Sequence, residues 1–78
     1  MKVQVLGMGC AKCAKLYEEI KKLAVENGLD IDLEKVEDLQ EIMAAGVMST
    51  PGLVIDGQVK ATGRIPDTAE LKSLLGLG

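Results

Sequence analysis

Strand-like and helix-like hydrophobic patterns alternate along this chain, and their order constrains the fold more than any other feature of the sequence. Residues 2–6 alternate apolar and polar side chains as a strand does, whereas residues 11–26 place apolar side chains at helical spacing. Residues 29–34 alternate again and carry an acidic outer face, which suits the edge of a sheet. The apolar positions of the helix are Ala14, Leu16, Tyr17, Ile20, Leu23 and Ala24. The first half of the chain therefore predicts a strand, a long helix and an edge strand.

Two capping patterns predict two further helices. Asp38 and Glu41 have the spacing of a helix capping box, and Asp67 and Glu70 repeat it. The expected apolar faces are Leu39, Ile42 and Met43 in the first helix and Leu71, Leu74 and Leu75 in the second. Glycines at 46 and 76 are typical helix ends, so both helices are expected to be short.

A hairpin completes the pattern. Residues 53–55 are apolar throughout, which is typical of a strand covered on both faces, and Asp56-Gly57 is a strong turn signal into a strand at 58–62. The predicted order is β-α-β-α-β-β-α. It indicates an α/β architecture: a four-stranded mixed sheet with its Val- and Ile-rich strands in the centre and helices on both faces. We expect two right-handed crossover steps.

The composition excludes several classes of function. A chain of 78 residues has room for one domain, residues 1–78, with a core of limited size. The absence of His excludes Ser-His-Asp and Cys-His catalytic sites and His-ligated metal sites. Nine basic and twelve acidic residues give a net charge of -3 without a basic cluster, so no nucleic-acid partner is expected. No segment fits a signal peptide or a membrane span, so we expect a cytoplasmic protein with no membrane partner.

Cys10 and Cys13 remain as the groups able to carry chemistry. In a reducing compartment such a close pair is more typical of catalysis or metal binding than of a structural bridge. The pair lies where the first strand gives way to the helix, and a helix N-terminus lowers the pKa of a thiol. Lys12 and Lys15 add positive charge, so both are candidate pKa-tuning residues. We predict that Cys10, at the exposed helix start, is the nucleophile and that Cys13, one turn on, is the resolving thiol.

Other functions are compatible with this short motif. The segment Met8-Gly9-Cys10-Ala11-Lys12-Cys13 also resembles the Met-x-Cys-x-x-Cys loop of heavy-metal-associated domains, which bind soft ions such as Cu(I). A soft-metal carrier of Cu(I) or Zn that uses Met8, Cys10 and Cys13 is therefore an alternative, and a redox-sensing interaction module is another. A further alternative is that the two cysteines have no function and pack as small hydrophobic residues. Heavy-metal-associated domains resemble a β-α-β-β-α-β order that ends on a strand, whereas this chain ends on a helix.

The methionines and the single tyrosine are interpreted as packing residues. Met8 is expected to be a flexible apolar cover beside the sulfurs, and Met43 and Met48 are expected to pack in the core and in a loop. Tyr17 is expected to pack against the core with its hydroxyl at the rim.

The second half of the chain distinguishes these alternatives. Ser49-Thr50-Pro51 stands just before the apolar strand, and Gly63 follows the last strand. Together with the Cys-x-x-Cys pair and the Asp56-Gly57 hairpin, these residues resemble the thioredoxin-like superfamily. The likeness is greatest to its small single-domain, redox-active-disulfide members, which are similar to both thioredoxin and glutaredoxin. It covers nearly the whole chain.

This resemblance implies roles for particular residues. Pro51 is expected to be a cis-proline that faces the cysteine pair, and the backbone of Thr50 is expected to bind an extended substrate segment. Gly63 is expected to let the backbone approach the same site. Thioredoxins also bury an acidic residue six positions before the first cysteine, and here that position is Gln4. Proton transfer during resolution is therefore expected to fall to water or to another group.

The dipeptide between the cysteines, Ala11-Lys12, and the Gly9 before them also depart from the thioredoxin and glutaredoxin patterns. The predicted function is nevertheless that of a thiol-disulfide oxidoreductase with a redox-active Cys10–Cys13 disulfide and no further cofactor. Its expected partners are disulfide-containing proteins or small molecules and a separate disulfide reductase. We expect it to act as a monomer.

Overall fold

The computed structural model describes residues 1–8 and 11–77. Its elements follow in the predicted order: β1 (Lys2–Leu6), α1 (Ala11–Glu26), β2 (Asp32–Val36), α2 (Leu39–Ala44), β3 (Gly52–Ile55), β4 (Gln58–Thr62) and α3 (Thr68–Leu74). The four strands form one sheet in the order β2-β1-β3-β4. β1 is parallel to β2 and antiparallel to β3, and β3 is antiparallel to β4. The predicted mixed sheet, its two central strands and its acidic edge strand are confirmed.

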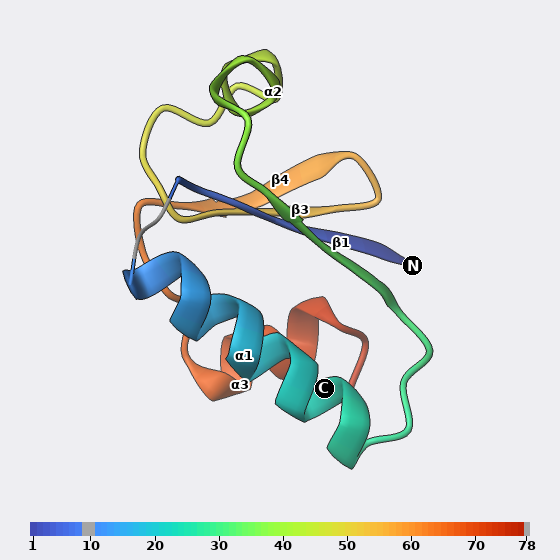
Figure 1. Cartoon of the computed structure of the whole chain (residues 1–78). Coiled ribbons are helices and arrows are strands. Elements are labelled where there is room, and N and C mark those ends of the chain that lie inside the picture. Colours follow the sequence, from blue (N-terminus) through green and yellow to red (C-terminus); the bar gives the residue numbers. More distant parts are fainter. Residues whose placement is uncertain (9–10, 78) are drawn as a thin grey trace.

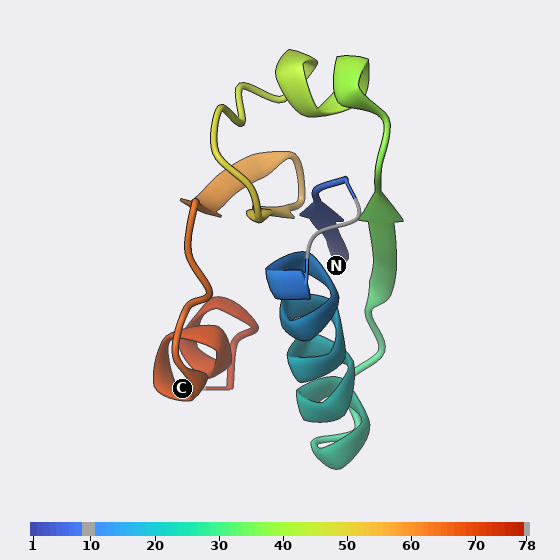
Figure 2. The ribbon, with the colours of Figure 1, turned by 60° about the vertical axis from the view of Figure 1, so that its left-hand side comes forward.

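Helices cover both faces of the sheet, as expected. α1 and α3 lie side by side on one face, and α2 lies on the other, near the end at which β1 finishes (Figures 1 and 2). The caps form as predicted: the Asp38 side chain accepts from the backbone N–H groups of Gln40 and Glu41, and Asp67 accepts from that of Glu70. These caps fix the start of each short helix.

Two expectations about the second strand and its crossover are wrong. The strand begins at Asp32, not at residue 29, because β2 pairs residue for residue with β1, from Lys2 opposite Asp32 to Leu6 opposite Val36. There is also one parallel crossover, β1-α1-β2, not two, since β3 runs antiparallel to β1. α2 is seen end-on while the strands run across the view in Figure 1, so this helix does not return the chain for another parallel strand.

The sheet separates two apolar clusters. The cluster beneath α1 and α3 consists of Val3, Val5, Cys13, Leu16, Ile20, Leu23, Leu53, Ile55, Ala61, Leu71 and Leu75. The cluster on the α2 face consists of Leu6, Val36, Ile42, Val47 and Val54. Cys13, and not the exposed Ala14, begins the buried stripe of α1, because Cys13 lies at helical spacing with Leu16 and Ile20. Tyr17 packs partly buried against the first cluster, and Lys35 Nζ lies 5.0 Å from its ring centroid.

The expected packing of α2 and of two methionines is also wrong. Ile42 is the buried residue of α2, whereas Leu39 and Met43 are more than half exposed and Met48 is 90% exposed. A helix of six residues touches the sheet with one turn, so Ile42 alone reaches the cluster on the α2 face. The apolar side chains that remain uncovered lie next to the candidate site described below.

Candidate active site

Cys13 lies in the first turn of α1, and its side chain points toward the end of β1. The residue is 3% exposed and belongs to the cluster beneath α1 and α3. Its Sγ lies 4.0 Å from the carbonyl oxygen of Leu6, an acceptor for the thiol proton when the sulfur carries one. The first turn of α1 contains no acidic residue, so no carboxylate on this turn opposes a negative charge at the helix start. Cys13 is therefore a shielded sulfur at the positive end of a helix.

Gly7 provides the space for this sulfur. A Cβ atom on Gly7 would overlap Cys13 Sγ and would lie 3.1 Å from Cys13 Cβ and 3.6 Å from Thr50 Cβ. The Gly7 backbone is buried, and its N–H donates to the carbonyl of Val36 at 2.9 Å. The requirement here is for space and not for a left-handed conformation, because its φ lies outside that region. Gly7 thus brings Cys13 and Thr50 to the same point at the end of β1.

Sequence reasoning did not identify this role of Gly7. A signal was present, since Gly7 directly follows an apolar strand and precedes the first cysteine by three residues. This position in the sequence indicates only that the backbone bends at Gly7. A residue without a side chain is needed there because the fold places this position against Cys13.

The segment expected to bind substrate lies against Gly63. The Thr50–Pro51 peptide bond is cis, as the resemblance implies, and Pro51 is buried. The N–H of Gly63 donates to the carbonyls of Ser49, at 3.1 Å, and of Pro51, at 2.9 Å. Gly63 has a φ of 71°, and a Cβ there would lie 3.1 Å from Ser49 Cβ, so both its conformation and its surroundings favour glycine.

The backbone of Thr50 remains available for a further strand. Neither its N–H nor its carbonyl has a hydrogen-bond partner among residues 1–8 and 11–77. Thr50 is exposed, whereas the neighbouring Pro51 and Gly52 are buried. An extended peptide could pair with this residue by β-augmentation.

The other predicted site residues have different outcomes. Cys10 lies outside the described residues, so its role as nucleophile stays a prediction. Lys12 and Lys15 are both exposed on α1. Lys15 lines a groove of about 320 Å³ between α1 and the start of α3, together with Glu19, Ile65, Pro66, Asp67, Thr68 and Leu71. The proposed effect of the two lysines on the thiols also stays a prediction.

Gln4 does not take the place of a buried acid beside Cys13. Its side chain is half-buried and its Nε2 donates to Glu34 Oε1 at 3.1 Å. Gln4 pairs in register with Val54, which belongs to the cluster on the α2 face, so strand alternation directs it away from the face that holds Cys13. No charged or polar side chain is buried in the part of the chain that the structure describes.

An ion pair holds the segment after β4 against α3. Arg64 donates to both carboxylate oxygens of Glu70, at 2.9 and 2.8 Å. This hydrogen bonding lowers the pKa of Glu70 below its ordinary value and raises the pKa of Arg64. The pair fixes the chain just beyond Gly63 while both groups stay on the surface.

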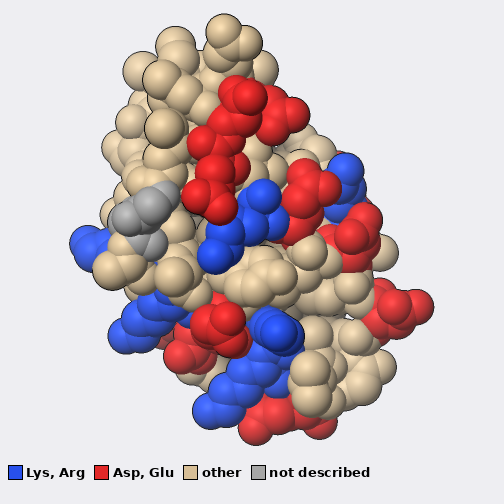
Figure 3. All heavy atoms as spheres, in the orientation of Figure 1, with Lys and Arg blue, Asp and Glu red and all other residues tan. Residues whose placement is uncertain are grey.

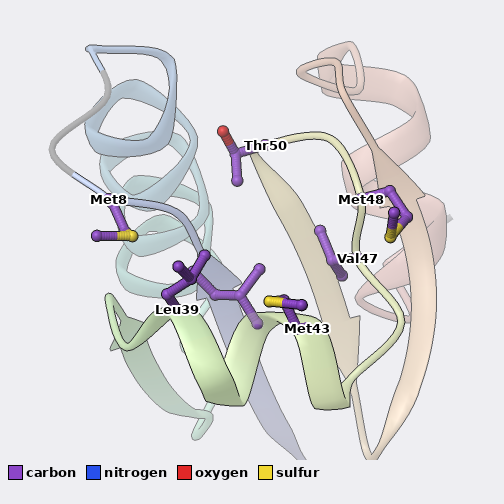
Figure 4. A pocket seen from close by; sticks show the side chains of 7 residues that line it. Met8, Leu39, Met43, Val47, Met48 and Thr50 are labelled. Atoms are coloured by element: carbon purple, nitrogen blue, oxygen red, sulfur yellow. The ribbon is translucent and has the colours of Figure 1, made fainter.

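An apolar groove of about 370 Å³ adjoins the site on its α2 side. It is lined by Met8, Leu39, Ile42, Met43, Val47, Met48 and Thr50, and is called the Met groove below (Figure 4). Met8 is exposed and lines the groove beside the start of α2 (Figure 4), and its expected role as an apolar cover beside the sulfurs stays a prediction. Sequence reasoning missed the groove because Met8 is far in sequence from residues 39–50, which supply the rest of the lining.

In the described part of the chain no helix has the length and apolar character needed to cross a membrane.

The comparisons with known proteins agree with this geometry. A family model described as a thioredoxin domain matches residues 1–76. A thioredoxin of Methanothermobacter thermautotrophicus is 37% identical over 75 residues, which cover 96% of this chain and 97% of that protein. A thioredoxin of Methanocaldococcus jannaschii is 40% identical over 73 residues, covering 94% and 84%. The chain therefore belongs to the thioredoxin family of thiol-disulfide oxidoreductases.

Proposed function

We propose that the protein reduces or exchanges disulfides through Cys10 and Cys13, with Cys10 as the attacking thiolate and Cys13 as the resolving thiol. The observation that carries this assignment is the burial of Cys13, which is 3% exposed beneath Gly7. A substrate disulfide cannot approach a sulfur so enclosed along the line that displacement requires. Attack on an external substrate is therefore assigned to the other cysteine, and Cys13 acts afterwards within the molecule.

The exchange proceeds in two displacements. The Cys10 thiolate attacks one sulfur of the substrate disulfide, which forms a mixed disulfide and releases one substrate thiolate. The Cys13 thiolate then attacks Cys10 sulfur, which forms the Cys10–Cys13 disulfide and releases the second substrate thiolate. The substrate gains two electrons, and two protons if both products become thiols, while the protein dithiol is oxidised to a disulfide. A separate disulfide reductase returns the protein to the dithiol.

The surroundings support each displacement. The start of α1, with Lys12 and Lys15, favours the thiolate form of the pair. The backbone of Thr50, beside Pro51 and Gly63, supplies a place for an extended segment of a protein substrate next to the sulfurs. No further cofactor is needed. The reaction suits a monomer in a reducing compartment such as the cytoplasm.

A single-turnover experiment tests this function. One equivalent of the reduced protein, freed of other thiols, is mixed with one equivalent of a peptide that contains one disulfide. We expect the peptide to be recovered as a dithiol and the protein as an internal disulfide, as measured by mass spectrometry after acid quenching. An unchanged peptide disulfide would refute the proposal, and Cu(I) affinity far above that of an ordinary dithiol would then favour the soft-metal carrier.

The burial of Cys13 also predicts how the two thiols react with a small alkylating agent. In the reduced protein, iodoacetamide is expected to modify Cys10 at least about tenfold faster than Cys13, because alkylation requires an exposed thiolate. Peptide mapping at a series of times measures the two rates. In denaturant the two rates should become similar, and equal rates in the folded protein would contradict the assignment of Cys13 as the shielded thiol.

A further inference from the structure

The exposed apolar side chains of this protein gather at one place. Seven large apolar side chains are exposed among the described residues, and four of them, Met8, Leu39, Met43 and Met48, line the Met groove. Isolated exposed apolar residues are ordinary, whereas a contiguous group marks an interaction surface. Thioether side chains are flexible and polarisable, so they adapt to apolar groups of different shapes.

The Met groove continues directly from the candidate active site. Thr50, which precedes Pro51, lines one side of the groove, and Met8, which follows Gly7, lines another (Figure 4). The groove extends from there over α2 through Leu39 and Met43. A chain that pairs with the backbone of Thr50 therefore has its neighbouring residues over the groove.

Acidic residues lie in the chain segment that supplies most of the Met groove lining. The segment 36–52 supplies every lining residue except Met8, and it contains Glu37, Asp38 and Glu41 but no Lys or Arg. None of these three carboxylates forms an ion pair with a residue that the structure describes. In Figure 3 acidic side chains run beside the uncharged surface over α2 and the link that leads into it. The negative charge of this segment attracts cations and disfavours acidic partner segments.

We propose that the Met groove docks a segment of a partner protein in which a Leu, Ile or Met side chain is flanked by Lys or Arg, and that this partner presents its disulfide to Cys10. The second part of this proposal, presentation of the disulfide to Cys10, rests on the proposed function. The occupant is a peptide segment because Thr50 is the one polar residue among the described residues of the lining, whereas small-molecule sites have several converging polar groups. A second copy of the chain is disfavoured, since it would bring the same acidic segment against itself.

Binding of peptides without cysteine tests the docking separately from the chemistry. Three peptides place Ser where the cysteines would stand: one has Leu flanked by Lys, one has Leu flanked by Glu, and one has Gly flanked by Lys. Titration of the isotope-labelled full chain, followed by nuclear magnetic resonance, gives each Kd and the amides that shift. We expect shifts around Met43, Met48 and Thr50 with the first peptide and about tenfold weaker binding of the other two.

Matched variants locate the interaction. Met43→Gln is expected to weaken the Leu-Lys peptide about tenfold, whereas Val25→Gln, which removes an exposed apolar side chain of α1, leaves its Kd unchanged. Glu37→Lys is expected to reduce the ratio by which the protein binds the Leu-Lys peptide more tightly than the Leu-Glu peptide. Glu26→Lys, with the same change of net charge, is expected to leave this ratio unchanged. Added salt should also reduce this preference.

The outcomes separate the two proposals. Equal binding of all three peptides, or equal effects of the groove variants and their controls, overturns the docking proposal even if disulfide exchange proceeds. Selective binding that depends on Met43 and Glu37 supports the docking surface, even if single-turnover exchange fails and the proposed function falls with it. When the cysteines are restored, the Leu-Lys peptide is expected to exceed the Leu-Glu peptide about tenfold in kcat/KM relative to a small disulfide such as hydroxyethyl disulfide.

Discussion

Cys10→Ser is expected to lower the turnover of a peptide disulfide by at least about 10³-fold, whereas Cys13→Ser is expected to halt the reaction at a mixed disulfide. A serine hydroxyl is not ionised at neutral pH and is a poor nucleophile toward sulfur, so the first variant cannot begin the exchange. The second variant can begin it but lacks the thiol that displaces the substrate. Turnover is measured with excess dithiothreitol as the electron donor, and the covalent adduct is measured by mass spectrometry without it.

The two variants control for each other, because each retains one of the two cysteines and has serine in place of the other. The adduct of Cys13→Ser should carry one substrate molecule on Cys10 and should be released by dithiothreitol. No adduct is expected on Cys13 of the Cys10→Ser variant, since that sulfur is buried. If instead Cys10→Ser keeps full exchange and Cys13→Ser traps nothing, the roles of the two cysteines are reversed.

Gly7→Ala is expected to destabilise the fold by about 2 kcal/mol, since its Cβ would occupy the position of Cys13 Sγ. Such a loss is a large part of the roughly 4–12 kcal/mol expected for a domain of this length. The clash is with Cys13, because Cys13 Cβ would also lie 3.1 Å from the new methyl group, whereas Thr50 Cβ at 3.6 Å would be in ordinary van der Waals contact with it. Urea unfolding of the reduced proteins measures the change in the free energy of unfolding.

A double-mutant cycle isolates the contact between these two residues. In a Cys13→Ala background the sulfur is absent, so Gly7→Ala is expected to cost less than about 1 kcal/mol, the remainder coming from Cys13 Cβ at 3.1 Å. The resolving step of Gly7→Ala should also be slowed, which the lifetime of the mixed disulfide measures. An equal cost of Gly7→Ala in both backgrounds would contradict the role assigned to Gly7.

Local patterns predicted most of the secondary structure, and pairing determined the rest. Residues 2–6, 11–26 and 58–62 form the elements that their patterns predict, because turn signals such as Asn27-Gly28 and Asp56-Gly57 lie next to them in the sequence. The bounds of β2 depend on its pairing with β1, which the pattern of residues 29–34 does not contain. The prediction that Leu39, Ile42 and Met43 all pack inward was wrong for a related reason. The number of α2 side chains that reach the sheet depends on how the helix is placed on it.

The candidate site was predicted unevenly for the same reason. Thr50, Pro51 and Gly63 were found through a family resemblance, and the structure brings these three residues together. The role of Gly7 and the Met groove depend on distances between residues far apart in sequence, so no local pattern indicates them. Met43 and Met48 illustrate the limit: apolar residues at helical or loop positions indicate burial only when another element covers them.

The placement of Cys13 and of the Met groove on different faces of the sheet has a consequence for evolution and engineering. The sulfur is held by the cluster beneath α1 and α3, whereas the groove is built on α2 and rests on the separate cluster that includes Ile42 and Val47. Substitutions among the exposed side chains of α2 leave the packing around Cys13 in place. One half of this small domain can therefore be adapted to new recipients of electrons while the other half keeps the same reaction.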